Sequence, residues 1–395
     1  MSMKNFRSVV RREIDIIRHD RNLIIVILLA PVVYALFLGS IFTQKIETDI
    51  PIVIVDNDRS EISRTLIRDL DAHQLLKVSS MTPNFDSARG EVIDAKAQAI
   101  VFIPRDFESG LKSGKAVDLP VYLNTARFLP SNDVNKAVSE VALTMAAGVR
   151  VKYYLMKGLN IDEATEMTQP LKGDIRPLFN TLDSYGDFLL PGLFVLILQQ
   201  TLLFGLSMSV ARERELKTLK SLSEKSGGNY MVAVLGKGLP YLILYGSYII
   251  FSLVVLFSLF NLNTEGSYSA LAVLLFLFFS GIVGFAIFIS SFFKKEIQAL
   301  QFLVFSSMPL FLISGYSWPV WSMPWPLQVL NQFSPGTPLF LSFVRITQMG
   351  AGWSDVRLEM LQLLALAIGW LILAMWRIKI VSKAENQNSP TAAES

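Results

Sequence analysis

Long uncharged apolar segments alternate with short charged segments over most of this chain. A bilayer core of about 30 Å needs roughly 20 apolar residues in a helix. Segments that reach or approach this length lie at residues 23–42, 188–210, 239–260, 268–292, 297–316 and 358–376. A buried helix of a water-soluble protein would explain one such segment but hardly all of them. The pattern therefore predicts six transmembrane helices.

Basic residues beside these segments predict their orientation, because cytoplasmic loops of membrane proteins are enriched in Lys and Arg. They cluster in 4–21, 211–238, 294–295 and 377–383, whereas the loop between the third and fourth segments has none. We therefore expect both chain ends in the cytoplasm and the long first loop outside. The first segment is too long for the core of a cleavable signal and lacks a small-residue cleavage site, so it should remain in the membrane.

Residues 44–186 lack such long apolar segments and are predicted to form an α/β domain outside the membrane. Strands are predicted at 49–56, 97–104 and 118–124, and helices near 60–72, 84–96 and 131–157. Strands that alternate with helices are typical of a small α/β fold. The fold class expected for the whole chain is thus an α-helical polytopic membrane protein with an inserted α/β extracytoplasmic domain.

The remaining segments complete the predicted organisation. Residues 23–43 form the first span, 187–380 hold the other five spans with a cytoplasmic segment at 211–238, and the polar residues 381–395 form a disordered tail. Residues 1–22 contain an amphipathic helix, whose apolar positions are Met3, Phe6, Val10, Ile14 and Ile17. This helix either flanks a transport pathway as an elbow along the inner membrane surface or merely supplies positive charge for topology.

Composition narrows the possible functions. Of the 395 residues, 52% are hydrophobic and 17% are charged, whereas a soluble domain has about 25% charged residues. Because the chain has no cysteine, disulfides and thiolate zinc sites are excluded. His19 and His73 are interpreted as surface residues, so neither a metal site nor a histidine-based catalytic site is expected. Nucleic-acid binding is a poor explanation of the net charge of +3.

The chain has no recognisable energy source of its own. It contains no GxxxxGK[ST] phosphate loop, so it is not expected to bind ATP in that manner, and no cofactor is expected in this chain. The predicted spans hold few ionisable residues, which argues against ion-driven transport. Gln199 and Gln200 lie near the middle of a span. They indicate either adhesion between helices or contact with a substrate.

The segment that joins the second and third spans is the most informative part of the sequence. It reads ARERELKTLKSLSEKSGGNYMVAVLGKGLPY, at residues 211–241, and begins as a charged helix that continues out of the bilayer. Glu213, Arg214 and Glu215 place both signs of charge within one turn. Such charges can set the register of a docked soluble partner, although a solvated loop would have the same composition.

This segment resembles the signature of type-2 ABC transporter permeases, in which E-R-E-x-G-T-L follows the second span and G-K-x-x-P comes later. The matching positions are Glu213, Arg214, Glu215, Thr218, Leu219, Gly236, Lys237 and Pro240. The chain departs from the pattern with Lys217 at the glycine position, with Lys220 where an acidic residue is common, and with SEKSGG in place of a proline-containing turn.

Two further stretches are similar to the same family. RHDRN at 18–22 resembles its arginine-rich entry to the first span, and SGYSWPVWSMPWPLQVLNQFSPGTPL at 314–339 resembles its hallmark between the last two spans. The prolines of the second stretch prevent a continuous helix, and non-helical backbone at membrane depth must be sheltered by protein or line a cavity. We expect a re-entrant element that closes the outer end of a pathway. Residues assigned to the pathway or this gate are Gln199, Gln200, Ser314, Gly315, Tyr316, Pro319, Met323, Pro324 and Pro335.

The resemblance covers nearly the whole chain and implies a permease that pairs with a second permease, identical or homologous, and with two separate ATPase subunits. ATP and Mg would be bound by those ATPases. Residues assigned to ATPase coupling are Arg18, Asp20, Arg21, Glu213, Arg214, Glu215, Thr218 and Leu219. The implied location is the inner membrane of a bacterium, in contact with membrane lipid. The implied cargo is hydrophobic, drug-like or lipid-like rather than a long polysaccharide.

Other functions remain open at the level of sequence. A membrane-anchored sensor or adhesion protein would act through the outer domain, but one or two spans would suffice for it. An ion-coupled carrier or an intramembrane enzyme would need ionisable groups that the spans largely lack. The outer domain itself would either gate exit of cargo or dock a periplasmic adaptor.

Overall fold

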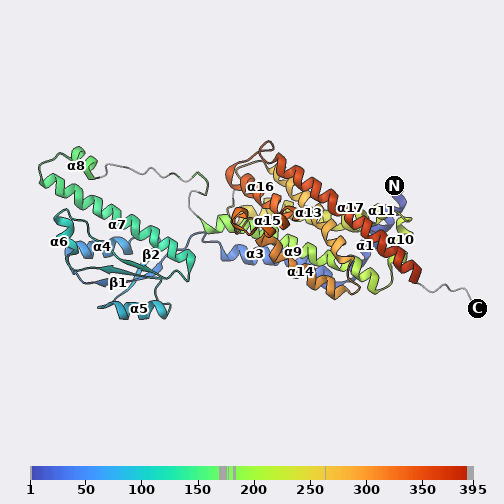
Figure 1. The fold of residues 1–395 in the computed structure, drawn as a ribbon, viewed down its shortest axis with the longest axis horizontal. Coiled ribbons are helices and arrows are strands. Elements are labelled where there is room, and N and C mark those ends of the chain that lie inside the picture. The colour runs from blue at the N-terminus through green and yellow to red at the C-terminus, as the bar shows by residue number, and fades with distance from the viewer. Residues whose placement is uncertain (1, 169–175, 177, 181–183, 263, 389–395) are drawn as a thin grey trace, which may run out of the picture. The chain divides into compact units, whose positions relative to one another are not determined.

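The computed structural model describes residues 2–168, 176, 178–180, 184–262 and 264–388. It divides into two compact units, which are described separately (Figure 1). Unit 1 comprises Met1–Lys45 and Leu178–Ser395 and is helical. Unit 2 comprises Ile46–Pro177 and contains a sheet. Unit 2 is inserted after the first apolar helix, within the range of 44–186 predicted for an α/β domain.

Unit 1 contains the apolar helices. Those long and apolar enough to cross a membrane, among the described residues, are Arg21–Ile41, Tyr185–Glu215, Tyr230–Leu259, Tyr268–Ser290 and Arg357–Ala384. A further apolar helix, α14 (Glu296–Leu312), has 17 residues. These six stretches overlap the six predicted segments. The fifth predicted segment extended to residue 316, but α14 ends at Leu312 and a turn follows.

The elements of unit 1 have the following bounds. They are α1 (Met3–His19), α2 (Arg21–Ile24), η1 (Ile25–Leu29), α3 (Ala30–Ile41), α9 (Tyr185–Glu215), α10 (Leu219–Ser226), α11 (Tyr230–Phe251), η2 (Ser252–Leu256), α12 (Phe257–Leu259), α13 (Tyr268–Ser290), α14, η3 (Val320–Ser322), α15 (Trp325–Phe333), α16 (Gly336–Met349) and α17 (Arg357–Asn388). The α1–α10 end and the α15–α16 end of this unit lie at opposite ends of its long helices (Figure 1).

Two helices form the centre of unit 1. Most of the hydrophobic window of α9 and more than half of that of α13 are buried, whereas only 22% is buried in each of the windows that contain α3, α11 and α17. Close packing at the centre depends on glycine: a Cβ at Gly284 of α13 would lie 2.7 Å from the backbone nitrogen of Leu371 in α17. The exposed faces of the outer helices are apolar, as a lipid-facing surface requires.

A proline leaves a backbone carbonyl of the first apolar helix without its helical hydrogen bond. A side chain from another helix bonds this carbonyl instead. Pro31 has no N–H group and therefore cannot bond the carbonyl of Ile27, four residues earlier. The hydroxyl of Tyr248 in α11 lies 2.9 Å from that carbonyl oxygen and 2.8 Å from the carbonyl oxygen of Leu28. The π-helical turn η1 lies at this point. The freed carbonyl is thus satisfied inside the protein, as a low-dielectric surrounding demands.

Unit 2 is a four-stranded sheet with helices on both faces. Its elements are β1 (Ile50–Asp56), α4 (Glu61–Asp71), β2 (Leu76–Met81), α5 (Phe85–Ile93), β3 (Ala99–Ile103), α6 (Phe107–Lys112), β4 (Val121–Leu123), α7 (Phe128–Met156) and α8 (Ile161–Thr168). The strand order is β2-β1-β3-β4, with β4 antiparallel to β3 and the other pairs parallel. Ile52 and Ile54 face α4 and α7, whereas Val53 and Val55 face α5.

Further differences from the sequence prediction include β2 and the end of α17. The strand β2 was not predicted, because its sequence LKVSSM has only two apolar residues in alternation before a polar pair. The predicted disordered tail, 381–395, is wrong for its first part, because α17 continues to Asn388. Val381 is buried there in a cluster with Val9 and Leu222, and this packing outweighs the polar composition. Residues 389–395 lie outside the described part of the chain.

Candidate functional site

The N-terminal helix α1 packs on the rest of unit 1 through a face that contains charge. Val9 lies against Gly236 of α11, where a Cβ would come within 2.7 Å of a Val9 methyl carbon, so only glycine allows this crossing. One turn further along the same face, Glu13 is 2% exposed. Arg12, beside it, has a side chain that is 13% exposed. The amphipathic pattern predicted the helix, but it did not predict a charged face directed into the protein.

Four charged side chains form a buried ion cluster where α1 packs on α9 and α11. Arg12 donates to both carboxylate oxygens of Glu213, at 2.5 and 2.7 Å. The ammonium of Lys237 lies 2.8 Å from a carboxylate oxygen of Glu13 and 3.0 Å from one of Glu213. Lys237, Glu13 and Glu213 are each 3% exposed or less. Two cations thus balance two carboxylates, which is the condition under which charges are tolerated in a protein interior.

Electrostatics in this cluster favour the charged forms. Burial alone would lower the pKa of Arg12, but the hydrogen bonds and attraction of Glu213 outweigh it and raise that pKa above its ordinary value. The cluster joins α1, α9 and α11, which are far apart in sequence. Removal of one partner would leave an uncompensated buried charge, so these three helices are held firmly together at this end.

The loop after α9 is tied to the same cluster. Thr218, which precedes α10, donates its hydroxyl to Glu213, and its backbone N–H bonds the carbonyl oxygen of Glu213 at 2.8 Å. Leu219 is 2% exposed and packs in the cluster of Val9. Lys217 adopts a φ of 55°, in the left-handed region that favours glycine. Glycine stands at this position in the signature that the loop resembles, and the backbone conformation gives the physical reason.

Of the predicted coupling residues in the RHDRN stretch, Asp20 is half-buried and the two arginines are exposed. Asp20 accepts from the backbone N–H of Leu23 at 3.1 Å and from Arg212 at 2.6 Å. Burial would raise the pKa of Asp20, but these bonds outweigh it and lower the pKa below its ordinary value. Arg18 and Arg21 are exposed. Asp20 therefore joins α2 to the end of α9, while the two arginines lie on the surface.

The other residues of the E-R-E motif have different surroundings. Arg214 donates to the backbone carbonyl oxygens of Ser291 and Phe293, at 2.8 and 3.0 Å. Glu215 is exposed, and its carboxylate accepts from the backbone N–H of Glu296 at 2.8 Å, which caps the start of α14. The sequence predicted that the charged side chains of this motif are available to a partner. The prediction is wrong for the side chain of Glu213, whose carboxylate is buried and bonded within the chain.

Sequence reasoning missed the role of Glu13 and gave Lys237 no role in a cluster. A signal was present, since Glu13 is an acidic residue inside a strongly basic helix, next to Arg12. The amphipathic pattern was described by its apolar and basic positions alone, so the acidic Glu13 was overlooked. Lys237 was noted as part of the Gly-Lys match alone. Neither residue could be paired from sequence, because they are 224 residues apart.

At the α15–α16 end, a tyrosine hydroxyl is inserted into the backbone of α9. Tyr316 donates to the carbonyl oxygen of Phe188 and accepts from the N–H of Gly192 at 3.2 Å. These two backbone groups are an i→i−4 pair that would otherwise bond each other. A Cβ at Gly192 would lie 2.3 Å from the Tyr316 ring. The ring also stacks on Phe188, with centroids 5.4 Å apart. Tyr316 thus anchors the end of α14 to the start of α9.

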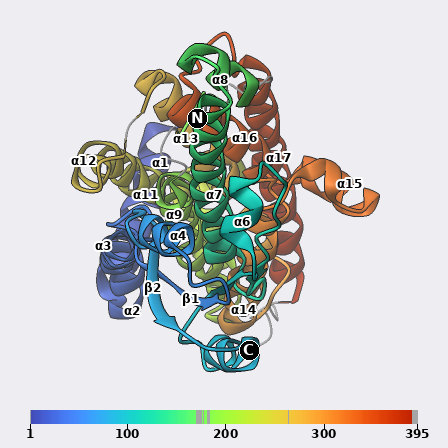
Figure 2. The ribbon, with the colours of Figure 1, turned by 90° about the vertical axis from the view of Figure 1, so that its left-hand side faces the viewer.

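The proline-rich stretch after Tyr316 is a broken helical hairpin. Gly315 adopts a φ of 92°, and a short turn, α15 and α16 follow in place of one continuous helix. Asn331 is buried and closes the hairpin, donating to the carbonyl oxygen of Ile313 at 2.5 Å and accepting from Thr337 at 2.9 Å. In Figure 2, α15 projects sideways beyond α17. The expected interruption of the helix is present in the structure.

The residues assigned to the outer gate differ in exposure. Ser314, Met323 and Pro335 are buried together with Tyr316, whereas Pro324 is exposed and Pro319 is half-buried. Pro319 and Pro324 are the N-cap residues that directly precede η3 and α15. Trp318, Trp321 and Trp325 are each more than 60% exposed, and large exposed aromatics are typical of a membrane interface.

The two glutamines of the second apolar helix also differ. Gln199 is 2% exposed, and its side-chain oxygen has no hydrogen-bond partner among the described residues. It lies seven residues, or two helical turns, after Gly192 and so on the same face of α9. Gln200 is half-buried. The two roles predicted for this pair, adhesion between helices and contact with a substrate, stay predictions.

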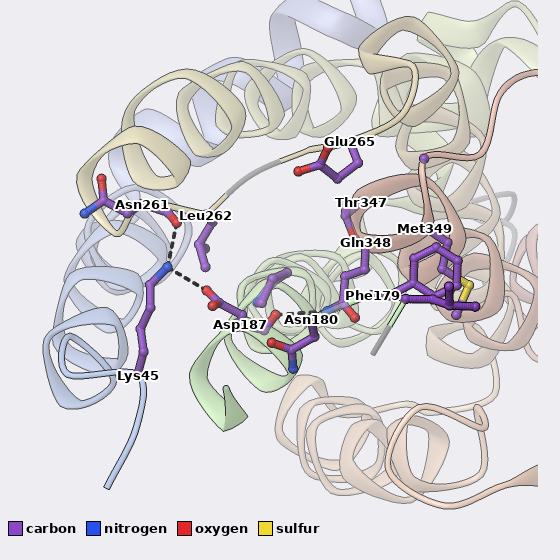
Figure 3. Close-up of a pocket in the computed structure, with 13 residues that line it drawn as sticks. Lys45, Phe179, Asn180, Asp187, Asn261, Leu262, Glu265, Thr347, Gln348 and Met349 are labelled. Carbon is purple, nitrogen blue, oxygen red and sulfur yellow. Dashed lines mark hydrogen bonds and ion pairs between the residues drawn. The ribbon is translucent and has the colours of Figure 1, made fainter. Parts of the chain in front are cut away.

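A cavity of about 580 Å³ lies at the α15–α16 end, between the end of α3, the start of α9 and the end of α16 (Figure 3). Lys45 spans one side, bonding Asp187 at 2.8 Å and the carbonyl oxygen of Asn261 at 2.7 Å. Gln348 donates to the carbonyl oxygen of Asp187 at 2.9 Å. Pro191, four residues later, cannot use that carbonyl, so a side chain again satisfies a backbone group that a proline frees.

Comparison with known sequences identifies the family. The profile described as "ABC-2 family transporter protein" matches residues 21–376, nearly the whole chain. This chain belongs to the ABC-2 transporter family. The match includes α2, α10, the ends of α9 and α14, and the hairpin of α15 and α16. The predicted family is thereby confirmed.

Curated relatives of this ABC-2 protein are distant. The "Probable multidrug ABC transporter permease YbhR" of Escherichia coli K12 is 24% identical over 331 residues, covering 83% of this chain and 85% of that protein. The protein of the same name from Escherichia coli O157:H7 matches equally. The ABC-2 chain is therefore a transport permease of the membrane, and its family implies ABC ATPase partners.

Proposed function

We propose that this permease is the membrane subunit of an ATP-driven exporter that moves a hydrophobic, drug-like or lipid-like molecule outward across the inner membrane of a bacterium. The buried ion cluster carries the proposal, because it joins α1, α9 and α11 at the end of the bundle that is rich in basic residues. The relative named as a multidrug permease supports the class of cargo. ATP and Mg would be bound by the ATPase subunits, which would act at this end.

In this proposal, the residues that contact the ATPase differ from those that transmit its motion to the helices. The exposed side chains of Arg18, Arg21 and Glu215 would contact the ATPase. Glu213 would not touch it, because its carboxylate lies inside the ion cluster. Thr218 fixes the start of α10 to that cluster, and Leu219 packs beside Val9 of α1. A push on the surface would therefore move α1, α10 and the ends of α9 and α11 as one body.

Motion at the α1–α10 end would reach the opposite end through α9, which runs between the two. Tyr316 is bonded into the backbone of α9, so a shift of this helix would strain its hydroxyl contacts. We infer that Tyr316 and the hairpin of α15 and α16 form the outer gate. A second permease, identical or homologous, would complete the pathway, and the exposed apolar face of α14, with Phe305 81% exposed, offers one surface for it.

Reconstitution tests the function directly. The chain is expected to copurify with an ABC ATPase, and proteoliposomes that hold both should move a hydrophobic dye only when ATP is hydrolysed. Addition of an ionophore should leave the rate unchanged, which separates this mechanism from ion-coupled transport. Dye movement by the chain alone, without any nucleotide-hydrolysing subunit, would refute the proposal.

Topology can be tested with single cysteines, because the chain has none of its own. Lys96→Cys lies on the surface of unit 2, where the Lys96 side chain is 68% exposed. Lys220→Cys lies on the exposed face of α10. With the outer membrane opened, a membrane-impermeant maleimide should label the first site in intact cells and the second only after lysis. The reverse pattern would invert the orientation. In the proposed orientation, unit 2 lies outside, where it would either gate the exit of cargo or bind a periplasmic adaptor.

A further inference from the structure

The helix α1 borders a groove that the ion cluster does not use. On the side next to its buried face, Phe6, Val10 and Ile14 together with Leu239 of α11 line a cavity of about 520 Å³. This volume lies within the usual range of small-molecule sites, about 300–1,000 Å³. The floor is apolar, and its four side chains come from two helices that are held together by Lys237 and Glu13. The groove is therefore a fixed feature of this end.

One edge of the groove is strongly basic. Arg7, Arg11 and Arg18 all line it and are all exposed. Their spacing of four and seven residues places them on one face of α1. Asp15 also lies on this edge, so three arginines and one aspartate give a net charge of +2. The arginines would compensate the charge of an anion bound at this edge. The uncharged part of the same molecule would lie against the apolar floor.

The apolar floor continues along α11 toward the other end of the bundle. Ile243, Ile250 and Val254 follow Leu239 at helical spacing, and each is 63% exposed or more. Gly246 lies in the same stripe, with open space where a Cβ would be. At 1.5 Å per residue, the stripe from 239 to 254 is about 22 Å long, which exceeds half of a bilayer core of about 30 Å. It is thus long enough for an acyl chain.

We propose that this groove binds an anionic phospholipid. Its phosphate lies against Arg7 and Arg11, and one acyl chain passes Val10 and Leu239 and continues along the exposed stripe of α11. An acidic peptide would complement the arginines but not an apolar stripe that runs to membrane depth. The proposal goes beyond the transport function, since it requires only that the chain lie in a bilayer.

The test measures binding of lipid to the purified full-length chain in detergent micelles. Phosphatidylglycerol with a fluorescent acyl chain should bind roughly 25-fold more tightly than the matching phosphatidylcholine, at about fivefold for each unit of positive charge. The double variant Arg7→Gln/Arg11→Gln should remove this preference and leave binding of phosphatidylcholine unchanged. Lys4→Gln, on the same helix but outside the groove, is the matched control and should keep the preference.

A second variant tests the apolar part of the site. Val10→Trp fills the groove while every arginine stays in place, so it should weaken binding of both lipids. Unchanged affinity for phosphatidylglycerol in either variant, or equal affinity of the wild type for both lipids, would overturn the proposal. Displacement of the lipid by inorganic phosphate or by polyglutamate would assign the site to a free anion or an acidic protein instead. Elution volume and thermal midpoint without lipid verify that each variant is folded. Because the readout uses neither ATP nor cargo, its failure is distinct from failure of the exporter function.

Discussion

Different interactions hold the helices together at the two ends of unit 1. At the α1–α10 end, three buried charges and the half-buried Arg12, from three helices, compensate one another, with Glu213 at their centre. At the α15–α16 end, prolines open the backbone, and the neutral side chains of Tyr316 and Gln348 bond the backbone groups of α9 there. Buried charge pairs are costly to break one at a time, whereas a displaced hydroxyl leaves groups that can find other partners.

This difference indicates at which end the helices can rearrange relative to one another. The ion cluster keeps α1, α9 and α11 as one body, because separation would expose unpaired charges to an apolar interior. The hydroxyl of Tyr316 occupies a gap between Phe188 and Gly192 that α9 can close by its own i→i−4 bond. A permease built in this way would transmit force at the first end and open at the second.

The largest expected effect comes from the centre of the ion cluster. Glu213→Gln keeps the shape of the side chain but leaves Arg12 and Lys237 with a single carboxylate, that of Glu13. Breaking a buried ion pair from one side costs about 3–5 kcal/mol of unfolding free energy. We expect a large fall in the thermal midpoint of the purified permease, together with loss of ATPase stimulation by cargo.

A matched control for this prediction is Glu224→Gln, which removes the same charge from the exposed face of α10. It should change the thermal midpoint little, because isolated surface charges contribute about 0–1 kcal/mol. Should Glu213→Gln be as stable as this control, the cluster would not be the rigid element that the comparison requires.

A smaller effect is expected at the opposite end. Tyr316→Phe removes the hydroxyl between Phe188 and Gly192 and keeps the stacked ring. A buried group left without its bond costs about 1–3 kcal/mol, and closure of the backbone pair should keep the loss near the lower limit. Tyr268→Phe, at a position that is 53% exposed, is the control. Differential scanning fluorimetry compares the two. A loss for Tyr316→Phe as large as that for Glu213→Gln would remove the proposed contrast between the ends.

The apolar pattern predicted the helices of unit 1 well because lipid imposes a length and a composition on each of them. Five of the six predicted segments coincide with long helices, and the fifth in order is the short α14. Alternation of strands and helices likewise predicted the sheet of unit 2, apart from β2. The end of α17 was mispredicted because Val381 packs against residues of α1 and α10, which local composition cannot reveal.

The candidate site could be predicted only in part. Motif spacing singled out Glu213, Thr218 and Tyr316, since these positions carry the family resemblance, and their roles stay predictions. It could not give their partners, because Glu13 and Lys237 come together only when α1 crosses α11 at Gly236. Charge on a helix was therefore interpreted as surface charge, whereas the structure buries Glu213 and leaves Glu215 exposed. Pairing of distant charges is a property of packing and not of any local pattern.

The smallest expected effect lies in the loop that connects the ion cluster to α10. Lys217 has a φ of 55°, a conformation that costs a residue with a Cβ about 1–2 kcal/mol. Lys217→Gly removes this strain, and the larger entropy of glycine in the unfolded chain offsets about 0.5–1 kcal/mol of the gain. We expect a slightly higher thermal midpoint. Lys217→Ala removes the same charge but keeps the Cβ, so the difference between the two variants isolates the backbone. A midpoint for the glycine variant below that of the alanine variant would mean that the strain at Lys217 is absent in solution.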